Sequence, residues 1–123
     1  MRGLLRRLRN LWNQAATVTH KESGVLVTLP GQEYNVLDCS GKDIVSMLGF
    51  VDLSSLRAGD IVEIYLKMAL KDQMVNRKME CKGPVAEPII DFPRKEAVNP
   101  IVSIKQTAGV SRSIHFTWRW SKL

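Results

Sequence analysis

The sequence predicts an all-β protein, an antiparallel β-sandwich of seven to eight strands preceded by one N-terminal amphipathic helix. Short segments rich in β-branched residues recur about every ten residues, between turn signals made of Gly, Pro, Asn, Asp or Ser. Helical periodicity is confined to residues 1–16. No helical segment separates the later strands, which excludes parallel βαβ units. We therefore expect residues 17–123 to form one β-sandwich domain, of jelly-roll or immunoglobulin-like type.

Residues 1–16 carry apolar and basic side chains on two separate faces of the predicted helix. At about 100° per residue, the apolar set falls on one arc of a helical wheel and the basic and amide side chains take the rest. The apolar stripe consists of Leu4, Leu5, Leu8, Leu11, Trp12 and Ala15, and the basic face contains Arg2, Arg6, Arg7 and Arg9. An isolated helix of this length is marginal in water, so the stripe needs to be buried. It can dock on its own sandwich, pack on another copy or a partner, or lie in an anionic membrane interface.

The first half of the β-rich part contains four predicted strand segments. Residues 17–19 and 25–29 are two of them, separated by an expected Lys-Glu-Ser-Gly turn. The turn signal Pro30-Gly31 leads into a strand over 33–40, and residues 44–51 form the next strand between two turns. In the Leu-x-Ala-Gly-Asp pattern at 56–60, Gly59 allows positive φ just before a strand begins. A phosphate-binding glycine loop needs several glycines and a following helix, so we interpret this segment as a hairpin-type connection.

The second half contains the clearest strand, residues 61–70, with residues 74–81 as its expected partner. Pro88, Pro93 and Pro100 restrict residues 89–92 to a short or edge strand, and residues 101–107 follow as a separate strand. The last strand covers 112–121. One of its faces is apolar and favours a place in the core; it consists of Ile114, Phe116, Trp118 and Trp120. The opposite face, His115, Thr117 and Arg119, is expected to contact a ligand or a neighbouring subunit.

Most of the positive charge lies in the N-terminal arm. The chain has a net charge of +6, and the four arginines of residues 1–16 leave only +2 for the rest. A nucleic-acid-binding domain more often carries its basic residues across a folded face.

The sequence shows no catalytic motif, so we expect a protein that is not an enzyme. No Gly-x-Ser-x-Gly elbow is present. The carboxylates of Asp60, Glu63 and Asp72 fall at strand ends or on exposed faces, where a solvated charge is expected. Two cysteines and two histidines at these separations do not predict a metal site, and no cofactor is expected. Cys39 and Cys81 are expected to be small buried side chains, with a disulfide between them as the alternative.

Targeting signals give a mixed pattern. Arg6, Arg7 and Arg9 interrupt any secretory core, whereas an acid-free, arginine-rich amphipathic start is compatible with a mitochondrial transit peptide. No run of about 18 apolar residues predicts a membrane-spanning helix.

The segment from 52 to 123 resembles small β-sandwich proteins of virus particles, the decoration, minor capsid or tail-associated subunits of tailed phages and archaeal viruses. The resemblance rests on Asp-Leu-Ser-Ser-Leu-Arg-Ala-Gly-Asp-Ile-Val-Glu-Ile at 52–64, on Ile-Lys-Gln-Thr-Ala-Gly-Val-Ser-Arg-Ser at 104–113, and on the closing aromatic-basic strand. It implies a multimer of sandwiches anchored to a larger lattice by a terminal arm, with a place in the virion; without it, the sequence predicts a cytoplasmic protein.

Three functions remain open at the level of sequence. The first is a non-enzymatic structural subunit that forms homo-oligomers or binds other structural proteins through residues 1–16. The second is a peripheral module that binds an anionic membrane or nucleic acid through the arginines of the helix. The third is a carbohydrate-binding module in which Trp118 and Trp120 stack on sugars.

Overall fold

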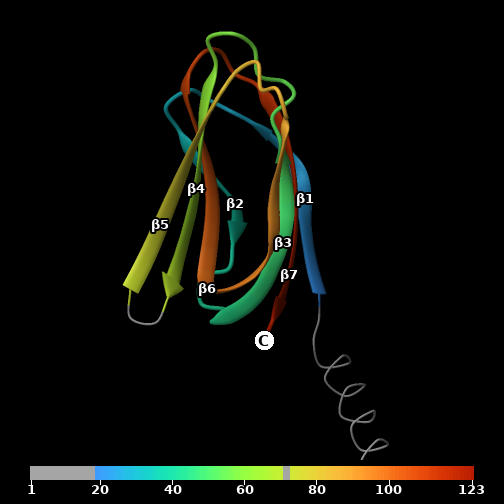
Figure 1. Ribbon diagram of the computed structural model, residues 1–123, viewed down its shortest axis with the longest axis vertical. Coiled ribbons are helices and arrows are strands. Elements are labelled where there is room, and N and C mark those ends of the chain that lie inside the picture. Colours follow the sequence, from blue (N-terminus) through green and yellow to red (C-terminus); the bar gives the residue numbers. More distant parts are fainter. Residues whose placement is uncertain (1–18, 71–72) are drawn as a thin grey trace, which may run out of the picture.

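A computed structural model describes residues 19–70 and 73–123, which form seven antiparallel strands (Figure 1). The strands are β1 (Thr19–Val27), β2 (Glu33–Asp38), β3 (Ile44–Asp52), β4 (Ile61–Leu70), β5 (Gln73–Lys82), β6 (Ile89–Ala108) and β7 (Ser113–Lys122). Every strand pair is antiparallel, which confirms the predicted all-β class. The helix expected over residues 1–16, and Asp72, lie outside the described residues. Within the described part, the structure has no helix of the length and apolarity needed to cross a membrane.

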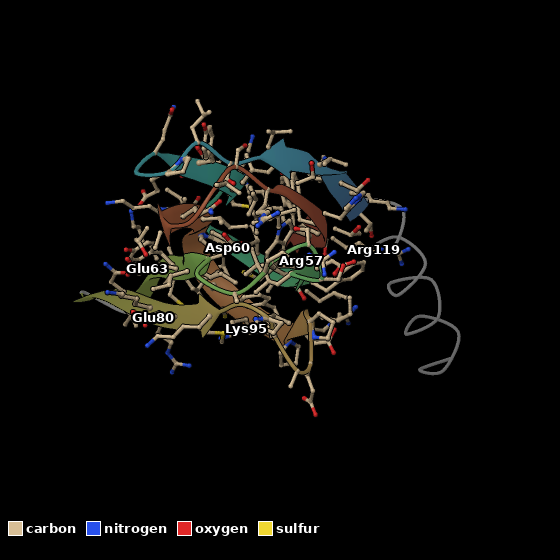
Figure 2. The ribbon with its side chains drawn as sticks, turned by 90° about the horizontal axis from the view of Figure 1, so that it is seen from above. Arg57, Asp60, Glu63, Glu80, Lys95 and Arg119 are labelled. Carbon is tan, nitrogen blue, oxygen red and sulfur yellow. The ribbon has the colours of Figure 1, made fainter. Side chains whose placement is uncertain are left out.

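The strands form one continuous sheet that folds into two layers around strand β6. The first layer has the order β1-β7-β3-β6 and uses residues 89–98 of β6. The second has the order β2-β6-β4-β5 and uses residues 98–108 of the same strand. Seen from above, the two layers lie on opposite sides of the core (Figure 2). The facing layers of the predicted sandwich are therefore joined by a shared strand.

The prolines of β6 do not interrupt the strand, so the prediction of two separate strands over 89–92 and 101–107 is wrong. Pro93 lies at a β-bulge, where the pairing with β3 jumps from Gly49–Phe92 to Met47–Lys95. Asn99, with φ of 48°, and Pro100 lie where β6 passes between the layers, and the pairing with β4 skips both residues. A bulge or corner needs no ladder hydrogen bond from proline, so both prolines are tolerated. The expected edge position is correct, because residues 89–92 pair with β3 alone.

Strand β1 runs through the turn that we expected at residues 21–24. It pairs with β7 without a register shift from Thr19–Ser121 to Val27–Ser113. Gly24, which suggested the turn, lies beside the Phe116 ring, so a neighbouring aromatic side chain covers the position that glycine leaves open.

One hydrophobic core fills the space between the layers. Trp118 is fully buried and Trp120 is 7% exposed, which confirms that this face of the last strand belongs to the core. The ring centroids of Phe92 and Trp118 are 5.0 Å apart, and the His20 ring stacks on Trp120 with 4.1 Å between the ring centroids. Cys39 and Cys81 are both free and buried, so the prediction of small apolar core residues is correct. Burial raises the pKa of the Cys39 thiol to about 11.

The connection at 53–60 joins β3 of the first layer to β4 of the second. It is therefore not hairpin-type, because β3 and β4 do not pair with each other. Gly59 has φ of 91°, as expected for a glycine just before a strand.

Candidate interaction surface

The three residues predicted to form an interface lie together on the outer face of the first layer. His115 and Arg119 are exposed and Thr117 is half-buried, while their neighbours Ile114 and Trp118 point into the core. Antiparallel register places other outward side chains beside them in rows that cross the sheet. The rows are Val25–His115–Asp52–Ile89, Ser23–Thr117–Phe50–Asp91, and Lys21–Arg119–Leu48.

One end of this outer face is apolar. Its exposed side chains are Val25 (53% exposed), Val27 (58%), Phe50 (36%) and Ile89 (45%), and we call them the apolar half. A hollow of about 490 Å³ lies in this half, lined by His115, Phe50 and Val25 among others. Exposed apolar side chains on one face make this half a candidate contact surface, although His115 and Asp52 lie between Val25 and Ile89.

Asp52 and His115 lie opposite each other within the apolar half. The backbone N–H and the hydroxyl of Ser54 donate hydrogen bonds that hold the pKa of Asp52 below its usual value, and His115 adds a smaller effect in the same direction. The carboxylate therefore stays charged among apolar side chains and gives this half a polar centre.

The other end of the face is basic. Lys21, Arg94 and Arg119 lie there, beside a row of hydroxyl side chains formed by Thr19, Ser121 and Ser46. We call these six residues the basic half. A hollow of about 200 Å³ is lined by both arginines and all three hydroxyl residues. A third hollow, of about 370 Å³, connects the two halves, because Phe50, Arg94 and Arg119 all line it.

Sequence reasoning found only three residues of this face, for two reasons. The turn expected at 21–24 hid the alternation of β1 that places Lys21, Val25 and Val27 on one side. Arg94 follows Pro93 at a bulge, where the period of two residues breaks. A continuous strand assigned to residues 19–27 would have placed Lys21, Val25 and Val27 on this face. The bulge at Arg94 has no signal in the sequence except the preceding proline.

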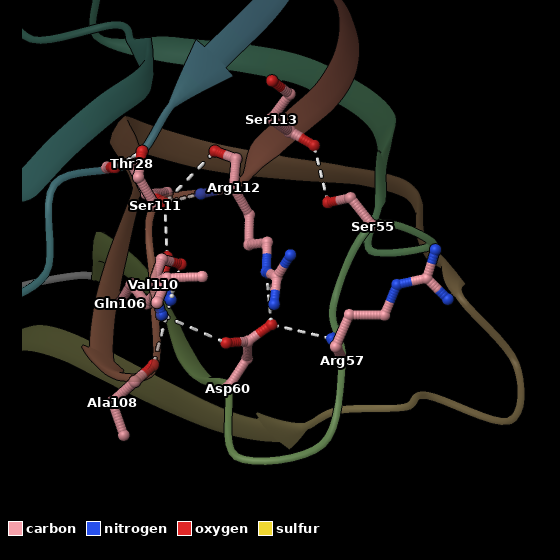
Figure 3. Close-up of polar contacts among 10 residues, drawn as sticks. All are labelled: Thr28, Ser55, Arg57, Asp60, Gln106, Ala108, Val110, Ser111, Arg112 and Ser113. Carbon is pink, nitrogen blue, oxygen red and sulfur yellow. Dashed lines mark hydrogen bonds and ion pairs between the residues drawn. The ribbon is translucent and has the colours of Figure 1, made fainter.

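A second polar cluster lies at the end of the sandwich where the loops meet, and it centres on Asp60 (Figure 3). Asp60 is 2% exposed, so the expectation of a solvated carboxylate is wrong for this residue. Its Oδ2 accepts hydrogen bonds from the Arg57 N–H at 2.7 Å and from Arg112 Nε at 2.6 Å, and its Oδ1 accepts one from the Val110 N–H at 3.3 Å. Burial is the largest single influence and would raise the pKa of Asp60, but these hydrogen bonds together outweigh it and lower the pKa.

Hydrogen bonds extend the Asp60 cluster to strand ends from both layers. Gln106 Nε2 donates to the carbonyl oxygens of Ala108 and Val110 at 2.9 and 2.6 Å, and the Thr28 hydroxyl donates to Gln106 Oε1. The Arg112 N–H donates to the Thr28 hydroxyl oxygen at 2.9 Å. These hydrogen bonds hold loops and strand ends together, so the role of the cluster is structural.

Glu63 is also buried, at 8% exposure, although we expected a solvated carboxylate. On the outer face of β4 and β5, the Glu63 carboxylate forms an ion pair with Lys78 at 2.5 Å. It also accepts a hydrogen bond from the Tyr65 hydroxyl at 2.9 Å. These two contacts lower the pKa of Glu63. Among the described residues, no group of three or more His, Cys, Asp or Glu side chains is arranged to hold a metal ion.

Comparison with known proteins gives structural neighbours only. No protein-family model matches this chain, and no curated protein matches it. The VP2 subviral particle of infectious bursal disease virus is similar, at 8% identity and a TM-score of 0.47, over 85% of this chain and 32% of that one. The Gx strain structure of the same virus is similar at 10% identity and a TM-score of 0.48, over 85% and 31%.

This chain thus spans about a third of the length of the proteins it resembles. The neighbours come from a viral particle, although not from a tailed phage or an archaeal virus. At these identities and TM-scores the similarity assigns neither a family nor a function to this chain.

Proposed function

We propose that this chain is a non-enzymatic structural subunit of a larger assembly, a virion component. In this proposal the two-layered β domain is the body, and Val25, Val27 and Ile89 of the apolar half contact a second copy. Phe50, which lies at the boundary with the basic half, stays outside this contact. Residues 1–16 anchor the subunit to the assembly through their apolar stripe. The same proposal includes the role of a decoration, minor capsid or tail-associated subunit.

The observation that carries the proposal is the exposed apolar half itself. Val25, Val27, Phe50 and Ile89 are 36–58% exposed, and all project from one layer. Val25 and Val27 belong to β1, an edge strand whose outer backbone groups pair with no other described strand. An edge strand with apolar neighbours is suited to a contact with another chain.

The strand order supports the same function by analogy of fold. Counting the two halves of β6 as separate strands, the layers contain four strands each, and the first and last strands of the domain are neighbours in one layer. This is the arrangement of a double-sheet jelly roll, a fold found in capsid and lectin domains. A fold hosts many functions, so the analogy supports the proposal without selecting it.

The carbohydrate-binding alternative loses the residues on which it depended. Trp118 and Trp120 are in the core and cannot stack on a sugar. Arg2, Arg6, Arg7 and Arg9 lie outside the described residues, and their role on an anionic membrane or nucleic acid remains a separate prediction.

Native mass spectrometry of the full chain tests the copy-to-copy contact. Val25 and Val27 are each about half exposed, so burying the remainder is worth roughly 1 kcal/mol per side chain. The double substitution Val25→Ser with Val27→Ser should therefore weaken self-association by roughly 30-fold for each copy that contributes its two valines to the contact. The wild-type chain should form dimers or larger oligomers at micromolar concentration.

A matched control removes two exposed apolar side chains elsewhere. Val110 and Met79 are 60% and 43% exposed and lie outside the apolar half, so Val110→Ser with Met79→Ser should leave the oligomer intact. Circular dichroism checks that all variants are folded. A monomeric wild-type chain, or equal weakening by both pairs, would contradict the proposal.

A further inference from the structure

The basic half combines two arginines with three hydroxyl side chains around one hollow. Arg94 and Arg119 line this hollow of about 200 Å³ together with Thr19, Ser46 and Ser121. No carboxylate is among its lining residues. Guanidinium groups bind phosphate oxygens in a bidentate manner, and hydroxyl side chains are common additional donors to phosphate.

The bulge in β6 explains how two arginines from different strands come to line one hollow. Between the Met47–Lys95 and Gly49–Phe92 pairs, Leu48 of β3 faces two residues of β6, Pro93 and Arg94. Arg119 of β7 pairs with Leu48 from the other side. A bulge redirects the side chain it carries, and here Arg94 joins Arg119 around Leu48.

The cations of the basic half have no internal counter-ion among the described residues. The ion pairs of the described residues are formed by Lys67, Lys78, Lys82 and Arg112. None of them includes Lys21, Arg94 or Arg119. The nearest acids by register are Asp91, which lines the connecting hollow, and Glu96, which pairs with Ser46. Neither lines the hydroxyl hollow, so its two guanidinium groups are available to an anion.

We propose that the basic half binds the phosphate groups of a single-stranded nucleic acid. Three cations form a row across the first layer, in the strand order β1-β7-β3-β6. Lys21 lies on β1, Arg119 on β7 and Arg94 on β6, with β3 between the two arginines. Three strand spacings make this row roughly 14 Å long, enough for more than one phosphate of an extended backbone. The row is part of the described sheet and is independent of the arginines of residues 1–16.

An exposed aromatic side chain favours a nucleic acid over a lipid headgroup. Phe50 lines the connecting hollow together with Arg94 and Arg119. Proteins that bind single strands pair a basic track with an aromatic ring on which a base stacks. A lipid headgroup offers a phosphate without a base, and the vesicles in the test below separate these two sources of phosphate.

Fluorescence anisotropy with a labelled twelve-nucleotide oligo-dT tests this site in the full chain. Arg94→Gln with Arg119→Gln should raise the Kd at least tenfold at 50 mM salt. The slope of log K against log salt should fall by about 1.4, because two phosphate contacts are lost. An abasic strand of equal charge should bind the wild-type chain more weakly than oligo-dT.

The matched control is Arg57→Gln with Arg77→Gln, which lowers the net charge by the same amount. Both side chains are exposed; Arg57 lies in the connection before β4 and Arg77 on β5, and neither lines the hollow of the basic half. Arg57 contacts Asp60 through its backbone N–H, which the substitution keeps. This pair should change the Kd less than threefold, since it removes only long-range attraction.

Two further ligands separate the sources of phosphate. Inorganic phosphate should shift the amide NMR signals of Ser46 and Ser121 at millimolar concentration, and vesicles of phosphatidylserine and phosphatidylcholine should show no dependence on Arg94 and Arg119. Equal weakening by the two arginine pairs would overturn the proposal, as would arginine-dependent binding to vesicles but not to oligo-dT.

The proposal goes beyond the assembly function, and native mass spectrometry of the Arg94→Gln, Arg119→Gln variant should show unchanged oligomers.

Discussion

At the scale of single residues, the buried carboxylate of Asp60 has the largest consequence. It follows the positive-φ Gly59 and receives hydrogen bonds from three residues in two loops, Arg57 in one and Val110 and Arg112 in the other. An acidic residue at a strand end is usually solvated, so sequence reasoning placed it in water. Burial became tolerable only because the fold brings Arg112 from 52 residues away.

Replacing Asp60 with Asn should destabilise the domain by about 2 kcal/mol, because Arg112 loses its charged partner in a buried site. Urea denaturation followed by circular dichroism measures this change. The exposed Asp91→Asn is the control and should alter stability by less than about 0.5 kcal/mol. Equal effects of the two substitutions would show that the cluster does not hold the loops.

The same variant should alter the response to acid. The pKa of Asp60 in the folded state lies below its ordinary value of 3.8. The stability that this carboxylate contributes is therefore fully present above pH 3.8 and is lost as the pH falls through the lower folded value. Between pH 5 and 2 the free energy of unfolding of Asp60→Asn should decline less steeply than that of the wild type. Parallel curves would contradict the linkage.

At the scale of elements, strand β3 depends on a glycine that the sequence did not single out. Gly49 pairs with Trp118, and a Cβ atom at this position would overlap the Thr117 carbonyl oxygen and the Trp118 indole. Neither a backbone oxygen nor a fully buried indole can move aside cheaply. The glycine is therefore required by packing, since its φ is not in the left-handed region.

Gly49→Ala should destabilise the domain by about 1–3 kcal/mol, which is the usual range for overpacking. At this chain length the melting temperature should drop by roughly 4 °C per kcal/mol. Gly24→Ala is the matched strand control, because its Cβ would lie 3.3 Å from the edge of the half-buried Phe116 ring, which can shift. A larger loss of thermal stability for Gly24→Ala than for Gly49→Ala would contradict this account of the packing.

At the scale of the whole molecule, charge and apolar surface are divided between the arm and the body. Residues 1–16 carry four of the six net positive charges, while the body has an apolar half and a basic half on one face. This division predicts that the arm contributes to assembly and not to the stability of the body.

Deletion of residues 2–16 should therefore leave the thermal midpoint of the domain within about 2 °C of the full chain. Attachment to the assembly should weaken, which native mass spectrometry or sedimentation velocity can measure. Substituting Arg2, Arg6, Arg7 and Arg9 with Gln in the full chain is the control that separates charge from the apolar stripe. A marked loss of thermal stability on deletion would show instead that the stripe docks on its own sandwich.

The sequence by itself determined the all-β class, most strand positions, and the core face of the last strand. These features depend on local alternation and turn chemistry, which a single segment carries. Only the tertiary structure decided that β6 is one strand, that Asp60 is buried, and that Lys21, Arg94 and Arg119 share a row. Each of these depends on pairing between segments far apart in the chain, at a bulge, a corner or an edge, and the local pattern of residues contains no record of the partner.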